Sequence, residues 1–220
     1  MKYGWRWITP TYSRIGTGYV FSNHHISEEE ALQEFLNDIP NHDIQPRLVD
    51  FHPQYSQKTF YKNYCLTGMA NGFLEPLDAP GLSLSIEVLN QLWSILKQNL
   101  TFQNYDGHYN IERANEVMNH KYQFWASFIL SQYKTSIRND TQFWIDHKNV
   151  QYDFYDNIFY LFQTLPVELL CRIKNVDMIF YTMAAKDVQW NLNYKRKPFV
   201  IPSVESKSIH HLDYIDLFHK

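Results

Sequence analysis

The sequence predicts an α+β fold, in which short β-strands that form part of a larger sheet are followed by a mostly helical region. Two observations about the residue pattern favour this fold class. Aromatic and β-branched runs bounded by proline or glycine occupy its first 82 residues. From Leu82 onward, apolar residues recur at helical spacing instead. An apolar content of 45% over 220 residues is enough to bury a core. We therefore divide the chain into a strand-rich segment, 1–82, and a helical region, 83–220.

The first predicted elements are two strands and a helix. Tyr3–Ile8 is rich in aromatic residues and ends close to a proline, as a strand would. Thr17–Ser22 has the composition of a second strand. Ser27 followed by Glu30 is the pattern of a capping box, and it starts a helix that ends before Pro40.

Two further strands are predicted at Arg47–Phe51 and Lys58–Thr67, with a polar turn at Pro53 between them. A strand without neighbours exposes unpaired backbone groups. These strands are therefore expected to need partners in a larger sheet.

The helical region begins with a long amphipathic pattern of leucine, valine and tryptophan residues. Later helices are indicated by capping residues, and one by a proline that fits a first turn. Phe143 and Trp144 are expected to pack between helices. The predicted helix starts are Leu82, Asn110, Asn139 or Asp140, and Thr164 with Pro166, with helical spacing again at Met178–Ala185.

Composition excludes several classes of function. The net charge is −3 and the basic residues are scattered, so neither a nucleic-acid partner nor an acidic membrane surface is expected. No apolar run reaches the ~18 residues of a membrane span. Cys65 and Cys171 are too few for a disulfide framework. His24–His25 and His210–His211 lack partners at metal-ligand spacing, so no metal site is expected. A cytoplasmic protein is the resulting prediction.

The sequence also lacks the glycine pattern of a nucleotide-binding loop. Only seven glycines are present, and the single G-x-G is Gly16-Thr17-Gly18. Phe21 stands where a third glycine would be needed for a dinucleotide fingerprint. A self-contained nucleotide-binding fold is therefore excluded.

Three segments carry a more specific signal. They are Gly4-Trp5-Arg6-Trp7-Ile8-Thr9-Pro10 with Arg14–Ser22, the stretch Asn63–Gly81 that contains Glu75-Pro76-Leu77-Asp78, and Tyr133 with Arg138–Trp144. In this order and spacing they resemble the flavin-dependent halogenases of the tryptophan-halogenase type. That family has a GWxWxIP motif, a G-[ST]-G-Y-V strand, an EPLE block and a Y-x-x-[ST]-x-R-x-D-x-x-FW pair of helices.

The resemblance implies an activity and its cofactors. In this family, reduced FAD reacts with molecular oxygen, and a halide ion attacks the resulting flavin hydroperoxide to give hypohalous acid, which halogenates an aromatic or indole-type substrate. The family's GxGxxG motif and its catalytic lysine have no counterpart in this chain. We therefore expect the chain to be the C-terminal half of such an enzyme, with 83–220 as its substrate-binding region. A flavin-binding N-terminal half or a separate flavin reductase is the expected partner.

By position in these motifs, the resemblance also assigns site residues. Trp5, Trp7 and Pro10 take the place of the motif beside the tunnel between the flavin and the substrate. Asp78 falls on the family's catalytic glutamate. A carboxylate suits this chemistry because ring halogenation must release a proton. The two residues whose backbone lies beside the halide in the family fall on Pro80 and Gly81.

Departures from the family pattern keep a second function open. Asp78 is one methylene shorter than glutamate, and Pro80 lacks the N–H that could bind a halide. The alternative is a non-catalytic remnant or helical binding module in which Asp78 is a turn residue or a helix N-cap. Glu75 would then bind backbone N–H groups. Lys174 and Asn175 stand where members that bind free tryptophan carry Phe-Trp, so free tryptophan is not expected as the substrate.

Overall fold

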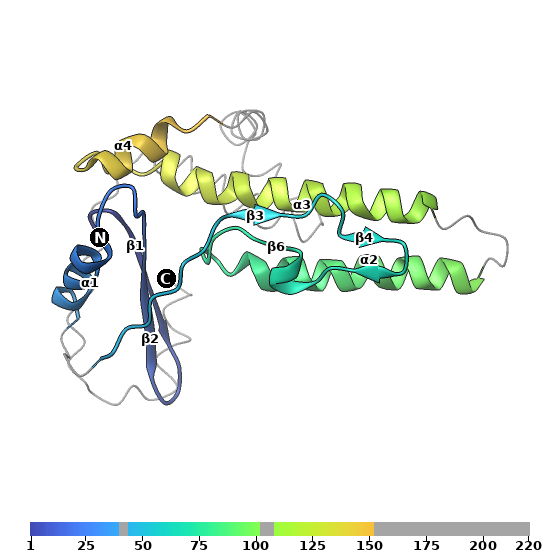
Figure 1. Ribbon diagram of the computed structural model, residues 1–220, viewed down its shortest axis with the longest axis horizontal. Coiled ribbons are helices and arrows are strands. Elements are labelled where there is room, and N and C mark those ends of the chain that lie inside the picture. Colours follow the sequence, from blue (N-terminus) through green and yellow to red (C-terminus); the bar gives the residue numbers. More distant parts are fainter. Residues whose placement is uncertain (40–43, 102–107, 152–220) are drawn as a thin grey trace, which may run out of the picture.

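Two long antiparallel helices, α2 and α3, form the frame of the computed structural model (Figure 1), which describes residues 1–39, 44–101 and 108–151. The short strands lie along this helix pair, and the long hairpin β1–β2 stands at one end of it. The elements are β1 Gly4–Pro10, β2 Ile15–Phe21, α1 Glu28–Asn37, β3 Gln54–Tyr55, β4 Phe60–Tyr61, β5 Tyr64–Cys65, the 3₁₀ turn η1 Gly68–Ala70, β6 Gly72–Phe73, α2 Pro80–Thr101, α3 His108–Lys134 and α4 Gln142–Asn149. This arrangement is α+β, as the sequence predicts.

The strands within the described residues form three antiparallel pairs, β1–β2, β3–β6 and β4–β5. The longest pair runs from Gly4 opposite Phe21 to Pro10 opposite Ile15, which confirms both predicted strands at the front of the chain. The pair β3–β6 joins segments that are separated by the whole β4–β5 hairpin.

Helix α1 begins at the predicted capping box. The Ser27 hydroxyl accepts a hydrogen bond from the Glu30 N–H at 3.2 Å, and the Glu30 carboxylate accepts one from the Ser27 N–H at 3.3 Å. Ala31 and Phe35, which are four residues apart on α1, are both buried, and the Phe35 ring stacks on Tyr19 of β2. The helix is thereby fixed to the hairpin.

The predicted strand at Arg47–Phe51 is wrong, because residues 44–53 contain no strand. Leu48 and Val49 are 54% and 65% exposed, although neighbouring residues of a strand point to opposite faces. Residues 44–50 are all exposed, and only Phe51, at the end of the segment, packs its ring, against Phe73. A strand here would gain no burial to offset the cost of ordering its backbone.

The single strand predicted at Lys58–Thr67 is also wrong, since this segment folds back on itself. Phe60 pairs with Cys65 and Tyr61 with Tyr64. Lys62, in the two-residue turn, has a φ of 52°. The sequence contains no glycine at this turn, so the usual signal for a two-residue hairpin is missing.

Helix starts differ slightly from the predictions. Helix α2 begins at Pro80, and α3 begins at His108, with Asn110 inside its first turn. The N-cap of α4 is Thr141, so the predicted caps Asn139 and Asp140 are wrong. The Asp140 carboxylate is instead held by a neighbouring arginine, which leaves the next residue to begin the helix.

The main core lies between α2, α3 and α4, with the short strands covering it. Val88, Met118 and Tyr122 are its least exposed members, and the Tyr122 ring stacks on Tyr55 of β3 with centroids 4.6 Å apart. Phe143 and Trp144 are buried in it, as predicted for residues between helices. The predicted helices at 164–166 and 178–185, and Cys171, Lys174, Asn175 and His210–His211, lie outside the described residues.

Candidate active site

Strand β1 presents Trp5 and Trp7 on one face, because alternate residues of a strand point the same way. The indole of Trp7 lies directly over Gly18 of β2, where a Cβ atom would come within 2.5 Å of Trp7 Nε1. At Gly16 a Cβ atom would meet the same ring at 3.3 Å. The G-x-G segment therefore makes room for an indole ring, which explains why it lacks the features of a phosphate loop.

Trp5, the other tryptophan on this face, connects three parts of the chain that are distant in sequence. Its Nε1 donates a hydrogen bond to Glu75 Oε1 at 2.5 Å and lies 3.0 Å from the Tyr133 hydroxyl. The Tyr133 hydroxyl also donates to Glu75 Oε1. Glu75 precedes α2 and Tyr133 lies near the end of α3. The carboxylate thus ties the strand, the approach to α2 and the end of α3 together.

Burial governs the ionisation of this cluster. It raises the pKa of Glu75, while the hydrogen bonds from Tyr133 and Trp5 act in the opposite direction. Burial also raises the pKa of Tyr133, and the nearby Glu75 charge adds to the shift. Tyr133 therefore remains a hydroxyl that donates its proton to the carboxylate.

Helix α4 supports the cluster from the other side. The Tyr133 ring lies 4.9 Å from the His147 ring and 6.0 Å from those of Phe143 and Trp144, measured between centroids. The tyrosine and the Phe-Trp pair of the third motif are therefore packed against one another. This packing positions the Tyr133 hydroxyl against Glu75.

The turn that follows Glu75 has an unusual backbone. Asp78 and Ala79 have φ values of 57° and 52°, in the left-handed region that side chains other than glycine rarely adopt. Both residues are exposed. Pro80 is buried and starts α2, which is the helix position where proline fits best. The turn consequently presents a carboxylate at the surface, immediately before a helix of 22 residues.

The beginning of α2 has the electrostatic character of an anion site. The first N–H groups of a helix have no carbonyl partner within it, and the helix dipole places partial positive charge there. Pro80 contributes no N–H, so of the two residues predicted to bind the halide only Gly81 offers a backbone amide. A Cβ atom built on Gly81 would meet nothing within 4 Å, which shows open space beside that backbone.

The structure brings some predicted site residues together and separates others. Trp5 reaches the Glu75–Asp78 block through Glu75, and Asp78 lies three residues further along. Pro10 is exposed at the far end of the hairpin, opposite Ile15. The alternative interpretation has Glu75 bind backbone N–H groups, whereas its donors among the described residues are the side chains of Trp5 and Tyr133. The link between Glu75 and Tyr133, 58 residues apart, has no signal in local sequence.

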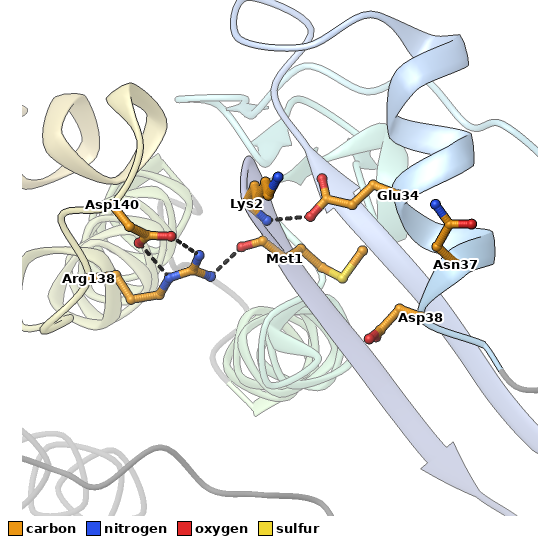
Figure 2. Close-up of a pocket in the computed structure, with 7 residues that line it drawn as sticks. All are labelled: Met1, Lys2, Glu34, Asn37, Asp38, Arg138 and Asp140. Carbon is orange, nitrogen blue, oxygen red and sulfur yellow. Dashed lines mark hydrogen bonds and ion pairs between the residues drawn. The ribbon is translucent and has the colours of Figure 1, made fainter.

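A separate open groove lies beside the N-terminus, where Figure 2 shows Arg138 between Asp140 and Met1. The guanidinium donates to both Asp140 oxygens, at 2.9 and 2.6 Å, and to the Met1 carbonyl. Glu34 of α1 accepts a hydrogen bond from the Lys2 N–H at 2.5 Å. These groups satisfy one another, so the R-x-D pair of the third motif fastens the front of β1 to the link between α3 and α4.

The described residues form no phosphate-binding site for a flavin. They contain no glycine-rich loop for a pyrophosphate, since Gly16 and Gly18 are occupied by the Trp7 ring. They also contain no group of three or more histidine, cysteine, aspartate or glutamate residues that could hold a metal ion. No helix in the described part of the chain is long and apolar enough to cross a membrane.

Comparison with known proteins decides the family. The family model described as tryptophan halogenase matches residues 1–168, which carry all three motifs. The chain belongs to the tryptophan halogenase family. It is 27% identical over 156 residues to the 7-chloro-L-tryptophan 6-halogenase of Kutzneria sp. (strain 744), covering 66% of this chain and 28% of that protein. It is 29% identical over 148 residues to the tryptophan 6-halogenase of Streptomyces toxytricini, covering 66% and 27%.

A solved structure extends this likeness to the fold. The crystal structure of the tryptophan halogenase from Shewanella frigidimarina matches with a TM-score of 0.69 and 25% identity, covering 92% of this chain and 39% of that chain. The chain therefore spans less than a third of the length of the two curated relatives and about two fifths of the solved halogenase.

Proposed function

We propose that this chain provides the substrate side of a flavin-dependent halogenase that halogenates an aromatic or indole-type ring by means of hypohalous acid. The observation that carries the proposal is the hydrogen bond between Trp5 and Glu75, which joins the tryptophan motif to the carboxylate block 70 residues away. Both motifs are family signatures, and here they meet at one end of α2. Membership of the family supports the reaction class.

In this proposal Asp78 is the base of the halogenation step. The substrate ring carbon forms a bond to the halogen as the halogen–oxygen bond of hypohalous acid breaks and the oxygen leaves as hydroxide. That carbon must then lose its proton, which together with the hydroxide accounts for the water formed. The exposed Asp78 carboxylate accepts this proton, which restores the aromatic ring. Asp78 is exposed on a left-handed backbone, so a substrate could reach its carboxylate from solvent.

The halide is assigned to the beginning of α2, beside Pro80 and Gly81. The Gly81 N–H would donate to the ion, and the helix dipole would favour its negative charge. Trp5, Trp7 and Pro10 are proposed to line the passage from the flavin to the substrate. Trp7 is 38% exposed, so its indole is accessible along the hairpin.

Reduced FAD, together with molecular oxygen as the oxidant, would supply the chemistry that converts the halide to hypohalous acid. The residues described here would border only one side of that cofactor. We assign the binding of FAD to a flavin-binding N-terminal half, and its reduction to a separate flavin reductase. The aromatic substrate is the third partner, and a ring other than free tryptophan is expected.

Two departures favour the second candidate, a non-catalytic binding module. Asp78 is shorter than the family's glutamate, and a displacement of ~1 Å in a proton-transfer group can cost ~10²-fold in rate. Pro80 removes one N–H from the proposed halide site. The two candidates differ in one measurable property, the formation of a halogenated product.

The test uses a chimeric halogenase, in which this chain replaces the matching segment of the Streptomyces toxytricini tryptophan 6-halogenase. With a flavin reductase, bromide and a panel of indoles, mass spectrometry is expected to detect a brominated product. The Asp78→Ala variant is expected to oxidise reduced flavin at the same rate and give no product. A chimera that retains FAD and oxidises it, with no halogenated product from any ring, favours the binding module instead.

A further inference from the structure

The turn between β2 and α1 carries a histidine whose two ring nitrogens are both engaged. His25 Nδ1 lies 2.9 Å from the Ser22 hydroxyl, and His25 Nε2 lies 2.9 Å from Asp146 Oδ2 of α4. A carboxylate can only accept, so Nε2 carries the proton whether or not the ring is charged. The Ser22 carbonyl also accepts hydrogen bonds from the N–H groups of His25 and Ile26, at 3.0 and 3.2 Å. The ring is therefore fixed at both edges, and it joins parts of the chain that are 121 residues apart.

Helix α4, which receives this hydrogen bond, depends on contacts with the rest of the molecule. It has eight residues, and its N-cap Thr141 makes no side-chain capping bond. Isolated helices shorter than about 12 residues are marginal in water. The first turn of α4 is held by the buried rings of Phe143 and Trp144. Beyond that turn, Asp146 accepts the hydrogen bond from His25, which lowers the pKa of the Asp146 carboxyl. His25 thus holds the later part of the helix.

The His25 ring also packs against the two rings of α4 that border Tyr133. It meets the Phe143 ring edge-on, with centroids 5.5 Å apart, and its centroid lies 6.0 Å from that of His147. The Phe143 and His147 centroids lie 4.1 Å from each other, and they lie 6.0 and 4.9 Å from that of Tyr133. The His25 side chain is only 15% exposed, so it is part of this ring cluster. A change at His25 therefore acts on the rings that position the tyrosine.

We propose that His25 is a positioning residue for the halogenation step, an inference that rests on the proposed function. By binding Asp146 it fixes α4, whose rings hold the Tyr133 hydroxyl on Glu75. Glu75 stands three residues before Asp78, so its place sets where the exposed turn begins. His25 touches neither the substrate nor the halide in this scheme. It acts through α4 on the direction in which the Asp78 carboxylate is presented.

The first test measures hydrogen exchange of the α4 amides in the intact chain by mass spectrometry. His25→Ala is expected to raise the exchange rate over residues 142–149 by about fivefold or more, because losing a hydrogen bond to a charged group makes local opening easier. Exchange in α2 around Val88 should stay as in the wild type. His24→Ala, at the exposed neighbouring residue, is the matched control and should leave α4 unchanged. His25→Gln keeps a donor at the position of Nε2 and should restore most of the protection.

The second test measures halogenation in the chimeric halogenase described above. The product per flavin oxidised is expected to fall about tenfold in His25→Ala, since a misplacement of ~1 Å can cost ~10²-fold and a relayed shift is smaller. The KM for the indole should change by less than about twofold, because the proposed effect is on kcat. His25→Gln should regain at least half of the wild-type product. A purely structural role would instead lower the bound FAD and the product together.

Several outcomes overturn the inference. One is equal α4 exchange in His25→Ala and the wild type, and another is an effect of His24→Ala as large as that of His25→Ala. The inference also fails if His25→Gln is no better than His25→Ala, if α4 is released without a change in product per flavin, or if product falls only with loss of FAD. Should His25→Ala not fold, Asp146→Ala applies the same tests from the other partner, whose side chain is 49% exposed.

The inference and the proposed function fail differently. A wild-type chimera that oxidises flavin without forming product removes the proposed function, and with it the role of His25 in the reaction. Unchanged α4 exchange in His25→Ala, with a wild-type chimera that forms product, removes the inference alone.

Discussion

Glu75 and Asp78 are two carboxylates of one short segment, yet their surroundings are opposite. Glu75 is largely buried and receives hydrogen bonds from Trp5 and Tyr133. Asp78 is exposed, on a backbone in the left-handed region. A carboxylate held by two fixed donors is suited to joining elements, whereas one at an exposed turn is suited to exchanging a proton with a substrate. Glu75 is therefore a structural carboxylate, whereas Asp78 is the proposed reactive one.

The largest expected effect belongs to Asp78. In the chimeric halogenase, Asp78→Ala is expected to lower the rate of halogenation by ~10²- to 10⁴-fold, the usual contribution of a positioned base. Product formation is followed by mass spectrometry while flavin oxidation is followed by absorbance. Asp78→Glu, which restores the family's residue, is the matched control and is expected to raise the rate above that of the wild type. A rate that is indifferent to both changes removes Asp78 from the reaction.

The next effect belongs to Glu75 and concerns stability. Glu75→Ala removes the acceptor of two partly buried donors, the Trp5 indole and the Tyr133 hydroxyl. We expect the free energy of unfolding to fall by about 2–4 kcal/mol, measured by urea denaturation of the intact chain. Asp78→Ala, at an exposed position, should change it by less than about 0.5 kcal/mol. Equal losses from the two variants would contradict the division of roles.

The ionisation of Glu75 gives a third, smaller effect. Burial raises its pKa in the folded chain above the ordinary value of 4.5, so the folded state holds the proton more tightly than the unfolded state. Its contribution to stability is then complete below pH 4.5 and is lost as the pH rises through the raised value. Relative to Glu75→Gln, the wild type should therefore lose stability as the pH rises above 4.5 toward neutrality. A stability difference that is flat over this range, measured by urea denaturation, would show that the folded state does not shift this pKa.

The smallest effect on stability is expected in the turn that contains Asp78 and Ala79. Ala79 has a φ of 52°, which costs a residue with a Cβ roughly 1–2 kcal/mol. Glycine avoids that cost but loses more freedom on folding, by roughly 0.4–1 kcal/mol. Ala79→Gly should therefore raise the free energy of unfolding by about 0.5–1 kcal/mol. Ala70→Gly should lower the free energy of unfolding instead, because Ala70, the last residue of η1, does not have a left-handed φ.

Local patterns predicted the local features of this molecule well. The capping box at Ser27, the two strands of the long hairpin and the helical packing of Phe143 and Trp144 follow from neighbouring residues. The segment 47–51 was mistaken for a strand because its composition suits one, while the missing partner is a property of the whole fold. The turn at Lys62 was missed because a lysine adopts the conformation that glycine or asparagine normally marks.

The site was predicted in part. The resemblance named Trp5 and Asp78, but it did not reveal that Glu75 and Tyr133 join them, because contacts between residues 58 to 128 positions apart arise only on folding. The amphipathic pattern of α2 was evident in the sequence, although several of its apolar residues are exposed in the structure. The division at residues 82 and 83 remains a prediction.

The roles of Asp78 and Glu75 are separated most directly by the amount of halogenated product formed per reduced flavin oxidised, measured for Asp78→Ala and Glu75→Gln of the chimeric halogenase alongside their melting temperatures. We expect Asp78→Ala to oxidise flavin without forming product and to melt like the wild type, whereas Glu75→Gln melts lower and still forms product. If Asp78→Ala forms as much product per flavin as the wild type, Asp78 is not the base.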